Sequence, residues 1–490
     1  MGLAAKPSMA ASPEVRYRRH VPEETRLYQI VQQHYPGFLQ AMRAQGTPLP
    51  GYVQEEFEAY LKCGRLEHGF LRVRCEQCHH ERLVAFSCKK RGFCPSCGAR
   101  RMAEGAALLA DEILPELPIR QWVISFPYQL RFLFAAYPSM MGDALAIIYR
   151  VISIYLIQKA GYTKQSTTTG AVTLIQRFGS ALNLNVHFHM LFLDGVYIKD
   201  QSGKLRFKQL PKPGIESLQT LVHTISHRIA RSLERKGLLE RDIENTYLQL
   251  DGMEADSMQS LYGHSITYRI AMGARQGSKV FTLQTVPERP QEPPNGLVAQ
   301  AVGFSLHAGV SARAEQRWKR ERLCRYITRP AISEQRLSVT SGGDIRYELK
   351  NPYRDGTTHV IFEPLDFMAR LAALVPKPRV NLTRYHGVFA PNCAYRAQVT
   401  PAGRGRGRKP ESPPAERHIA MTWAQRLKRV IKIDIEVCEH CGGKVNVIAS
   451  IEDPQVIEKI LGHIKREQQA SLPSAQIDWL QHERAPPRLH

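Results

Sequence analysis

The chain has 490 residues, with 67 lysines and arginines against 45 aspartates and glutamates and a formal net charge of +22. This length predicts roughly three or four domains, and so large a positive excess is typical of proteins that bind nucleic acid. Arg150 interrupts the most apolar stretch, 144–157, and the N-terminus has no signal-peptide core, so we expect a cytoplasmic protein that uses no membrane.

Residues 1–55 predict a basic helical arm. Apolar residues recur there at helical intervals, namely Leu27, Ile30, Val31, Tyr35 and Phe38. Pro36 lacks a backbone N–H and is therefore expected to kink or end this helix.

Residues 56–110 contain two Cys-x-x-Cys pairs, Cys75 with Cys78 and Cys94 with Cys97, separated by fifteen residues. Each pair offers two thiolates, and a tetrahedral zinc ion takes four. The spacing therefore predicts a four-cysteine zinc ribbon with structural Zn²⁺. Cys63, His68 and Cys88 are in excess of one site. They form part of a second zinc centre, or Cys88 is simply buried.

Basic side chains surround the predicted ribbon together with one aromatic ring, Phe93. The candidate DNA contacts are Lys89, Lys90, Arg91, Arg100 and Arg101. Cations and an aromatic ring on a rigid scaffold suit contact with phosphates and bases. A zinc-stabilised module without DNA contact is the alternative.

Residues 111–400 predict one α+β domain, because strand-like and helix-like patterns follow one another. The expected strands are 119–126, 171–178, 184–193, 265–270 and 279–283, and the expected helices are 140–159 and 215–236. The second and third strands are close in sequence, so we expect them to pair as antiparallel neighbours, which would bring Gln176 beside the third.

The strand 184–193 carries two histidines on one face. Its apolar residues alternate with Asn185, His187 and His189, so the two imidazoles project together while the opposite face packs on a core. Two imidazoles side by side are a candidate site for one divalent cation.

A proline-rich loop at 285–296 is followed by a basic helix predicted over 311–329, with Ser311 as its N-cap and Pro330 as its end. Tyr326 lies near the end of this helix between Arg325 and Arg329, and Arg322 is a further candidate DNA contact. Residues 401–418 are rich in Gly, Arg and Pro, which predicts a disordered basic linker.

The last predicted unit, 419–490, contains Cys438 and Cys441. One Cys-x-x-Cys pair supplies only two zinc ligands. His440, His463 or Cys393 would complete this candidate second metal site, or the pair binds no metal.

Two histidines and a tyrosine beside arginines indicate phosphoryl transfer on DNA. Gln176 is the preferred third ligand of a Mg²⁺ or Mn²⁺ ion, with His307 and Asp194 as alternatives. Tyr326 would attack phosphorus, and Arg325 and Arg329 would neutralise charge on the phosphate. Tyr385 and Tyr395 lie in less basic surroundings.

The order of these motifs resembles the bacterial insertion-sequence common-region (ISCR) transposases, which are rolling-circle HUH endonucleases. The resemblance covers about residues 55–465 and rests on Phe93–Cys97, Gln176–Gly179, Asn185–His189, Arg322–Pro330, Arg384–Gly387 and Cys438–Gly443. Two-tyrosine relatives carry a second tyrosine four residues before the first, where this chain has Arg322, so the chain resembles the single-tyrosine branch.

The resemblance implies a transposase that nicks and rejoins single-stranded element ends through a 5′-phosphotyrosine, in the bacterial nucleoid. No Walker A motif is present, so unwinding would come from a host helicase or replication machinery. A relaxase or replication initiator with the same chemistry is the first alternative. The second, a non-catalytic zinc-dependent DNA-binding protein, leaves the histidine strand and the tyrosine helix unexplained.

Overall fold

The computed structural model describes residues 21–200, 203–241, 246–249, 256–288, 296–403, 425 and 436–470. The chain forms two compact units. The larger unit comprises residues 26–58 and 89–432, and the smaller unit comprises residues 1–25, 59–88 and 433–490.

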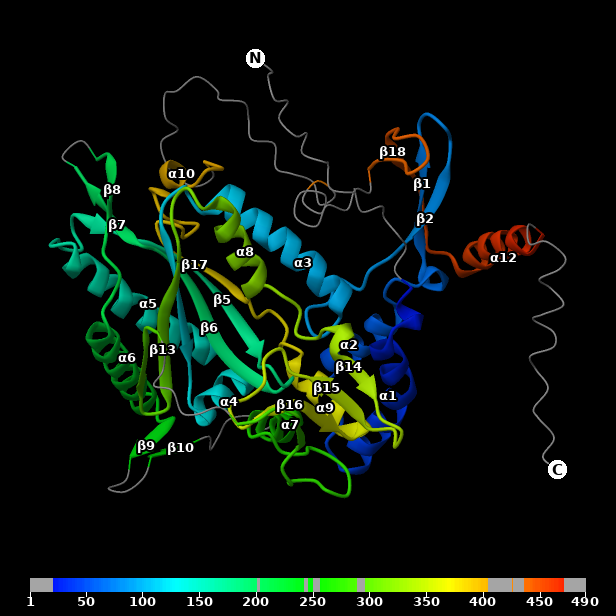
Figure 1. Cartoon of the computed structure of the whole chain (residues 1–490), viewed down its shortest axis with the longest axis horizontal. Coiled ribbons are helices and arrows are strands. Elements are labelled where there is room, and N and C mark those ends of the chain that lie inside the picture. Colours follow the sequence, from blue (N-terminus) through cyan, green and yellow to red (C-terminus); the bar gives the residue numbers. More distant parts are fainter. Residues whose placement is uncertain are drawn as a thin grey trace, which may run out of the picture. The chain divides into compact units, whose positions relative to one another are not determined.

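The larger unit is built on a six-stranded sheet in the order β12-β13-β3-β6-β5-β17 (Figure 1). These strands are β12 Val298–Ala301, β13 Phe304–Ala312, β3 Ile119–Ser125, β6 Leu184–Leu193, β5 Gly170–Phe178 and β17 Thr383–Gly387. Every neighbouring pair is antiparallel. The predicted strands 119–126, 171–178 and 184–193 are confirmed, and the expected pairing of the last two is confirmed as well.

One face of this sheet is apolar and packs on helices α4 (Tyr128–Ala136), α5 (Ser139–Lys159) and α6 (Ile215–Glu234). Phe188 and Phe192 of β6 are fully buried on this face. Among the described residues, α5 is the one helix long and apolar enough to cross a membrane. Its Tyr149 ring stacks on Phe192 at 5.7 Å between centroids, which is the packing of a core helix.

The other face of the sheet carries the histidines and lies under α3 (Pro95–Ala107), the π-helical η3 (Leu108–Ile113) and α8 (Arg317–Ile327). Leu191 and Leu193 project on the same side of β6 as His187 and His189. They share one core cluster with Leu323 and Ile327 of α8, so α8 packs on the histidine face.

The rest of the larger unit frames this sheet. Its helices are α1 Arg26–Ala44, α7 Met258–Ile266, α9 Pro364–Leu374 and α10 Arg396–Val399, with the first eight residues of α2 Gly51–Lys62, and a second sheet has the order β11-β16-β15-β14. Those strands are Phe281–Gln284, Thr357–Phe362, Ile345–Glu348 and Leu337–Val339. Small sheets are formed by β4 Thr167–Thr168, β7 Gly195–Lys199 and β8 Leu205–Gln209, and by β9 Leu239–Arg241 and β10 Thr246–Leu248.

Three sequence-based predictions about these elements differ from the structure. Helix α1 does not end at Pro36 but continues to Ala44; stacking of Tyr35 on Phe57, 4.7 Å between ring centroids, holds the helix against its neighbour. Residues 265–270 are not a strand; α7 ends at Ile266, and the Ser265 hydroxyl accepts a hydrogen bond from the Leu184 N–H.

The third is the helix predicted from Ser311. Ser311 belongs to β13, whose buried Phe304, Leu306 and Ala308 alternate as in a half-buried strand. Helix α8 therefore begins at Arg317, and Gln316 is its N-cap residue.

The smaller unit contains a three-stranded antiparallel sheet in the order β18-β1-β2. Its elements are η2 Leu66–His68, β1 Phe70–Cys75, β2 Glu81–Ala85, β18 Val445–Ile451 and α12 Pro454–Ala470. The C-terminal segment, predicted to be a unit of its own, supplies β18 to this sheet. The predicted linker lies outside the described residues from 404 onward.

Candidate functional site

His187 and His189 lie side by side on β6, with ring centroids 4.9 Å apart. Nδ1 of His187 donates a hydrogen bond to the Asn185 carbonyl at 2.8 Å. This bond fixes the tautomer in which Nε2 keeps its lone pair, the arrangement seen in metal-ligating histidines. Burial lowers the pKa of His187 to about 4, so the ring is neutral at physiological pH.

His189 also has a hydrogen-bond partner at Nδ1, but of the opposite kind. The side-chain Nε2 of Gln121, on the neighbouring strand β3, lies 2.6 Å from Nδ1 of His189 and can only donate to it. The Nε2 atom is buried and has no hydrogen-bond partner among the described residues. Burial, with the nearby charges of His187 and Arg329, lowers the pKa of His189 to about 3. Two neutral imidazoles side by side on one strand fit a divalent cation.

Gln176 of β5 is paired in register with His187, as expected from the sequence. Its Nε2 donates a hydrogen bond of 2.5 Å to the carbonyl of Ile327 at the end of α8. The amide oxygen is thereby left for another partner, which is what a third metal ligand requires. The same bond ties the strand beside the histidines to the residue after Tyr326.

The two alternative ligands differ. Asp194 is paired with Arg120 through both carboxylate oxygens, at 2.9 and 2.7 Å, and this pair is buried. A carboxylate committed in this way is not a metal ligand, so that alternative is wrong. His307 of β13 pairs in register with Val123, which in turn pairs with His189, so His307 lies on the histidine face two strands away.

Tyr326 lies on α8 with 44% of its surface exposed. The guanidinium of Arg329 lies over its ring at 4.4 Å, and the ammonium of Lys350 lies 5.0 Å from the same ring. Both cations and Arg336 line a pocket of about 350 Å³ together with Tyr326. This pocket suits a phosphate beside a phenol.

Arg329 links this pocket to the histidines. Its positive charge contributes to the lowered pKa values of both His187 and His189, after the larger effect of burial. Its Nη1 atom is buried and has no hydrogen-bond partner among the described residues. Arg325 directly precedes Tyr326 on α8, and adjacent residues on a helix do not face each other. Its side chain therefore projects in a different direction from that of Tyr326.

A second pocket, of about 530 Å³, shares Phe178, Arg329, Pro330 and Ala331 with the first. Arg91 and Arg101, two of the predicted DNA contacts, also line it. Gly98 of α3 abuts the same segment, since a Cβ atom at this position would be 3.0 Å from Cβ of Pro330. The start of α3 therefore borders the loop that follows Tyr326.

The other predicted DNA contacts have partners within the larger unit. Lys90 pairs with Glu55 at 3.2 Å, and Arg100 pairs with Glu104 at 3.4 Å. The backbone of Lys89 has a positive φ of 53°, and its carbonyl accepts a hydrogen bond from Arg101. These contacts fix the conformation of the basic segment 89–101. Its contact with DNA stays a prediction.

Of the two competing tyrosines, Tyr385 lines the larger pocket together with Gln176 and Arg329. Tyr385 of β17 is half-buried and pairs in register with Val172, and the guanidinium of Arg396 lies 5.3 Å from its ring. Burial raises the pKa of Tyr385. Tyr395 lies near Lys199, whose ammonium is 5.9 Å from its ring.

In the smaller unit, the sulfur atoms of Cys75, Cys78, Cys438 and Cys441 lie within 4.8 Å of one another. Sγ of Cys75 is 3.5 Å from that of Cys441, and Sγ of Cys78 is 3.5 Å from that of Cys438. Four thiolates at about 2.3 Å from a tetrahedral zinc ion stand about 3.8 Å apart. The four sulfurs therefore fit Zn²⁺.

This arrangement corrects the predicted zinc ribbon. The partners of Cys75 and Cys78 are Cys438 and Cys441, and not Cys94 and Cys97. The turn after Cys441 depends on glycine, because a Cβ atom at Gly443 would be 3.0 Å from Sγ of Cys75 and 2.7 Å from Oε1 of Gln77. The backbone N–H of Cys78 lowers the pKa of the Cys75 thiol to about 6, which favours the thiolate.

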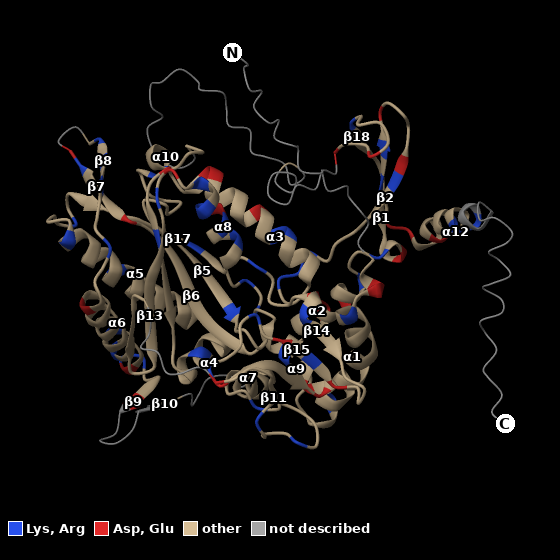
Figure 2. Cartoon of the chain, in the orientation of Figure 1, with Lys and Arg blue, Asp and Glu red and all other residues tan. Residues whose placement is uncertain are grey.

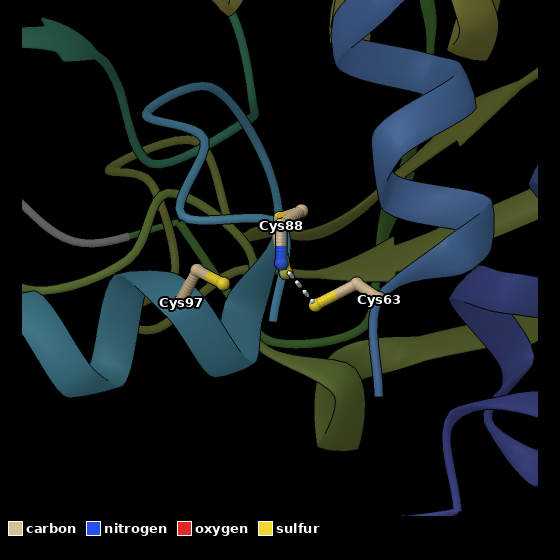
Figure 3. A group of neighbouring side chains, drawn as sticks. Cys63, Cys88 and Cys97 are labelled. Atoms are coloured by element: carbon tan, nitrogen blue, oxygen red, sulfur yellow. Dashed lines mark hydrogen bonds between the residues drawn. The ribbon is translucent and has the colours of Figure 1, made fainter. Parts of the chain in front are cut away.

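The remaining cysteines of the predicted ribbon belong to different units. In the smaller unit, the backbone N–H of Cys88 donates a hydrogen bond of 3.2 Å to the sulfur of Cys63 (Figure 3). In the larger unit, Cys94 is the N-cap residue of α3 and Cys97 lies in its first turn, both buried.

Two family models match the chain. Residues 170–397 match the model described as "Putative transposase", and residues 30–126 match the model described as "Transposase zinc-binding domain". The chain is an IS91-family-like transposase with a zinc-binding domain. No curated protein and no solved structure matches the chain. A transposase acts on DNA, which accounts for the net charge of +22.

The first match contains the histidine pair, Gln176 and Tyr326 of this transposase, and the second contains Cys63, Cys75, Cys78, Cys88, Cys94 and Cys97. Structural Zn²⁺ is supported by the zinc-binding family and by the four-cysteine site. Sequence reasoning missed Gln121, Arg336 and Lys350, which reach the site from other strands and turns. The only sequence signal for Arg336 and Lys350 is that each is an isolated basic residue, and Gln121 has no such signal.

Proposed function

We propose that this transposase is a tyrosine HUH endonuclease that nicks and rejoins single-stranded DNA through a 5′-phosphotyrosine. The observation that carries the proposal is the position of α8 on the histidine face of the sheet, with the Gln176 side chain bonded to the carbonyl of Ile327. This contact joins the strand beside His187 to the helix turn that carries Tyr326.

In the proposed cleavage step the phenolic oxygen of Tyr326 forms a bond to the scissile phosphorus. The bond between phosphorus and the 3′ oxygen breaks, the phenolic proton passes to solvent, and the 3′ oxygen takes up a proton. Arg329 and Lys350, which lie over the ring of Tyr326, balance the negative charge of the phosphate. Because one phosphate ester replaces another, the reverse reaction rejoins a strand without ATP.

His187, His189 and Gln176 would hold the Mg²⁺ or Mn²⁺ ion, with His307 as the alternative third ligand. Such an ion supplies Lewis-acid polarisation of the phosphate when it is bound. The hydrogen bond that His187 donates to the Asn185 carbonyl, and the one between Gln121 and His189, hold both rings in one orientation before DNA arrives.

The cellular role proposed from this chemistry is mobilisation of an insertion sequence by a rolling-circle-like route in the bacterial cytoplasm. The substrates are single-stranded element ends, and a host helicase or the replication machinery would expose them. We further propose that Cys63, Cys88, Cys94 and Cys97 act as ligands of structural zinc, because all four fall within the matched zinc-binding domain.

The direct test is to incubate the purified chain with labelled single-stranded element ends and Mn²⁺ and to search for a covalent protein–DNA adduct on a denaturing gel. An adduct that resists boiling in detergent and disappears after protease treatment is expected. A non-catalytic DNA-binding protein gives no adduct, whereas a relaxase gives one on a plasmid transfer origin and none on element ends.

Replacing His187 by alanine is expected to reduce adduct formation by about a hundredfold or more, while affinity for single-stranded DNA stays within about twofold. The reason is that the change removes one proposed metal ligand and no phosphate contact. His227→Ala, an exposed histidine of α6, is the matched control. Equal loss of binding and cleavage in His187→Ala would show that the histidine acts on folding or on DNA contact instead.

A further inference from the structure

We infer that Trp318 is a stacking platform for an unpaired base of the DNA strand whose phosphate reaches Tyr326. This inference rests on the proposed function and adds a binding residue to it. Trp318, Arg322 and Tyr326 are spaced by four residues on α8, so they form one stripe along the helix. The stripe runs from an aromatic platform at one end to the proposed nucleophile at the other.

The side chains of this stripe are exposed. Trp318 has 65% of its surface exposed and Tyr326 has 44%. The guanidinium of Arg322 lies over the indole of Trp318 at 4.9 Å, just as Arg329 lies over the phenol of Tyr326 at 4.4 Å. Each ring is therefore backed by a cation and keeps a further surface open.

Packing does not explain Trp318. The core of the larger unit is reached from the opposite side of α8, through Leu323, Cys324 and Ile327. Two polar contacts fix the start of the helix: Arg317 pairs with Asp111 at 2.7 Å, and Arg320 donates to the Pro115 carbonyl at 2.9 Å. By contrast, Trp122, the other tryptophan that the structure describes, is 1% exposed.

The chemistry of the stripe fits single-stranded DNA. Lysines and arginines gather on and around α8, as Figure 2 shows, and such a surface attracts a phosphate backbone. Aromatic rings beside a basic groove are the recurrent means of binding unpaired bases. A duplex keeps its bases stacked on one another, so it offers no free face to an indole. From Trp318 to Tyr326 the helix rises about 12 Å, a span of a few nucleotides.

The test uses equilibrium binding without metal, measured by fluorescence anisotropy with labelled oligo(dT). The Trp318→Ala variant should bind about 5- to 150-fold more weakly than the parent, the range given by one stacked base. Trp318→Phe should recover most of the affinity. A strand of the same length made of abasic nucleotides should bind equally to parent and variant, because it has no base to stack.

Phe281→Ala is the matched control, since Phe281 is 44% exposed and the guanidinium of Arg275 lies 4.3 Å from its ring. Its affinity for oligo(dT) should not change. Unchanged affinity in Trp318→Ala, or an equal loss on the abasic strand, would overturn the inference. So would a change in oligomeric state on light scattering, which would make Trp318 a contact between protein copies.

This design separates the inference from the proposed function. Binding of oligo(dT) needs neither the metal nor the phenol, so a chain that forms no adduct can still show the Trp318 effect. Conversely, Trp318→Ala could form the adduct at saturating DNA and bind oligo(dT) as tightly as the parent. That result would support the nuclease proposal and refute the stacking role of Trp318.

Discussion

Replacing Tyr326 by phenylalanine is expected to abolish the covalent protein–DNA adduct and to leave DNA binding within about twofold of the parent. The substitution removes one oxygen atom, the proposed nucleophile. The aromatic ring that Arg329 and Lys350 contact remains, so the pocket and the end of α8 should keep their shape. A denaturing gel measures the adduct, and anisotropy on the same labelled strand measures binding.

Tyr385→Phe is the matched control for this experiment. Tyr385 is a half-buried tyrosine on β17, at the edge of the same sheet, and the guanidinium of Arg396 lies near its ring. We expect this variant to form the adduct at the parental level. If the adduct survives in Tyr326→Phe and is lost in Tyr385→Phe, the nucleophile is Tyr385 and the role given to α8 is wrong.

The histidine strand could be predicted from the sequence because its signal is local. Alternation along 184–193 assigns each side chain to a face, and that assignment holds in β6, where Phe188 and Phe192 are fully buried. Pairing of β5 with β6 also follows from their closeness along the chain. The hydrogen-bond partner of His189 could not be predicted from the sequence, because Gln121 is 68 residues away and its position depends on the register of β3.

Other predictions failed where a contact distant in sequence overrides a local preference. Pro36 is tolerated inside α1 because aromatic packing holds the helix. The basic run from 311 to 329 reads as one helix by charge, whereas the burial of Phe304 and Leu306 extends the preceding strand to Ala312. Charge content alone does not tell a helix from the end of a strand.

The pairing of the cysteines shows the same limit. Spacing identifies each Cys-x-x-Cys pair as half of a zinc site, but it says nothing about which halves meet. Spacing alone favours the nearer pair, Cys94 and Cys97, as the partner of Cys75 and Cys78. In the structure the partner is the distant pair, because β18 pairs with β1 over Val445–Ile451 and brings Cys438 and Cys441 beside Cys75 and Cys78.

Replacing Cys438 by serine is therefore expected to remove one zinc ion per chain and to destabilise the smaller unit. Cys438 is 4% exposed, and its sulfur is 3.5 Å from that of Cys78, so the loss leaves three thiolates for a tetrahedral ion. Binding of a structural zinc ion is worth about 10 kcal/mol or more to a small domain. Without it, β18 should separate from β1, and limited proteolysis should release the C-terminal segment early.

Zinc content by elemental analysis decides between the two ways of pairing the cysteines. Cys75→Ser should match Cys438→Ser, because both belong to one site. Cys393→Ser, a half-buried cysteine outside both groups, should keep the parental zinc content and protease resistance. If Cys438→Ser also kept them, the four-cysteine site would be refuted, and Cys75 and Cys78 would again need Cys94 and Cys97 as partners.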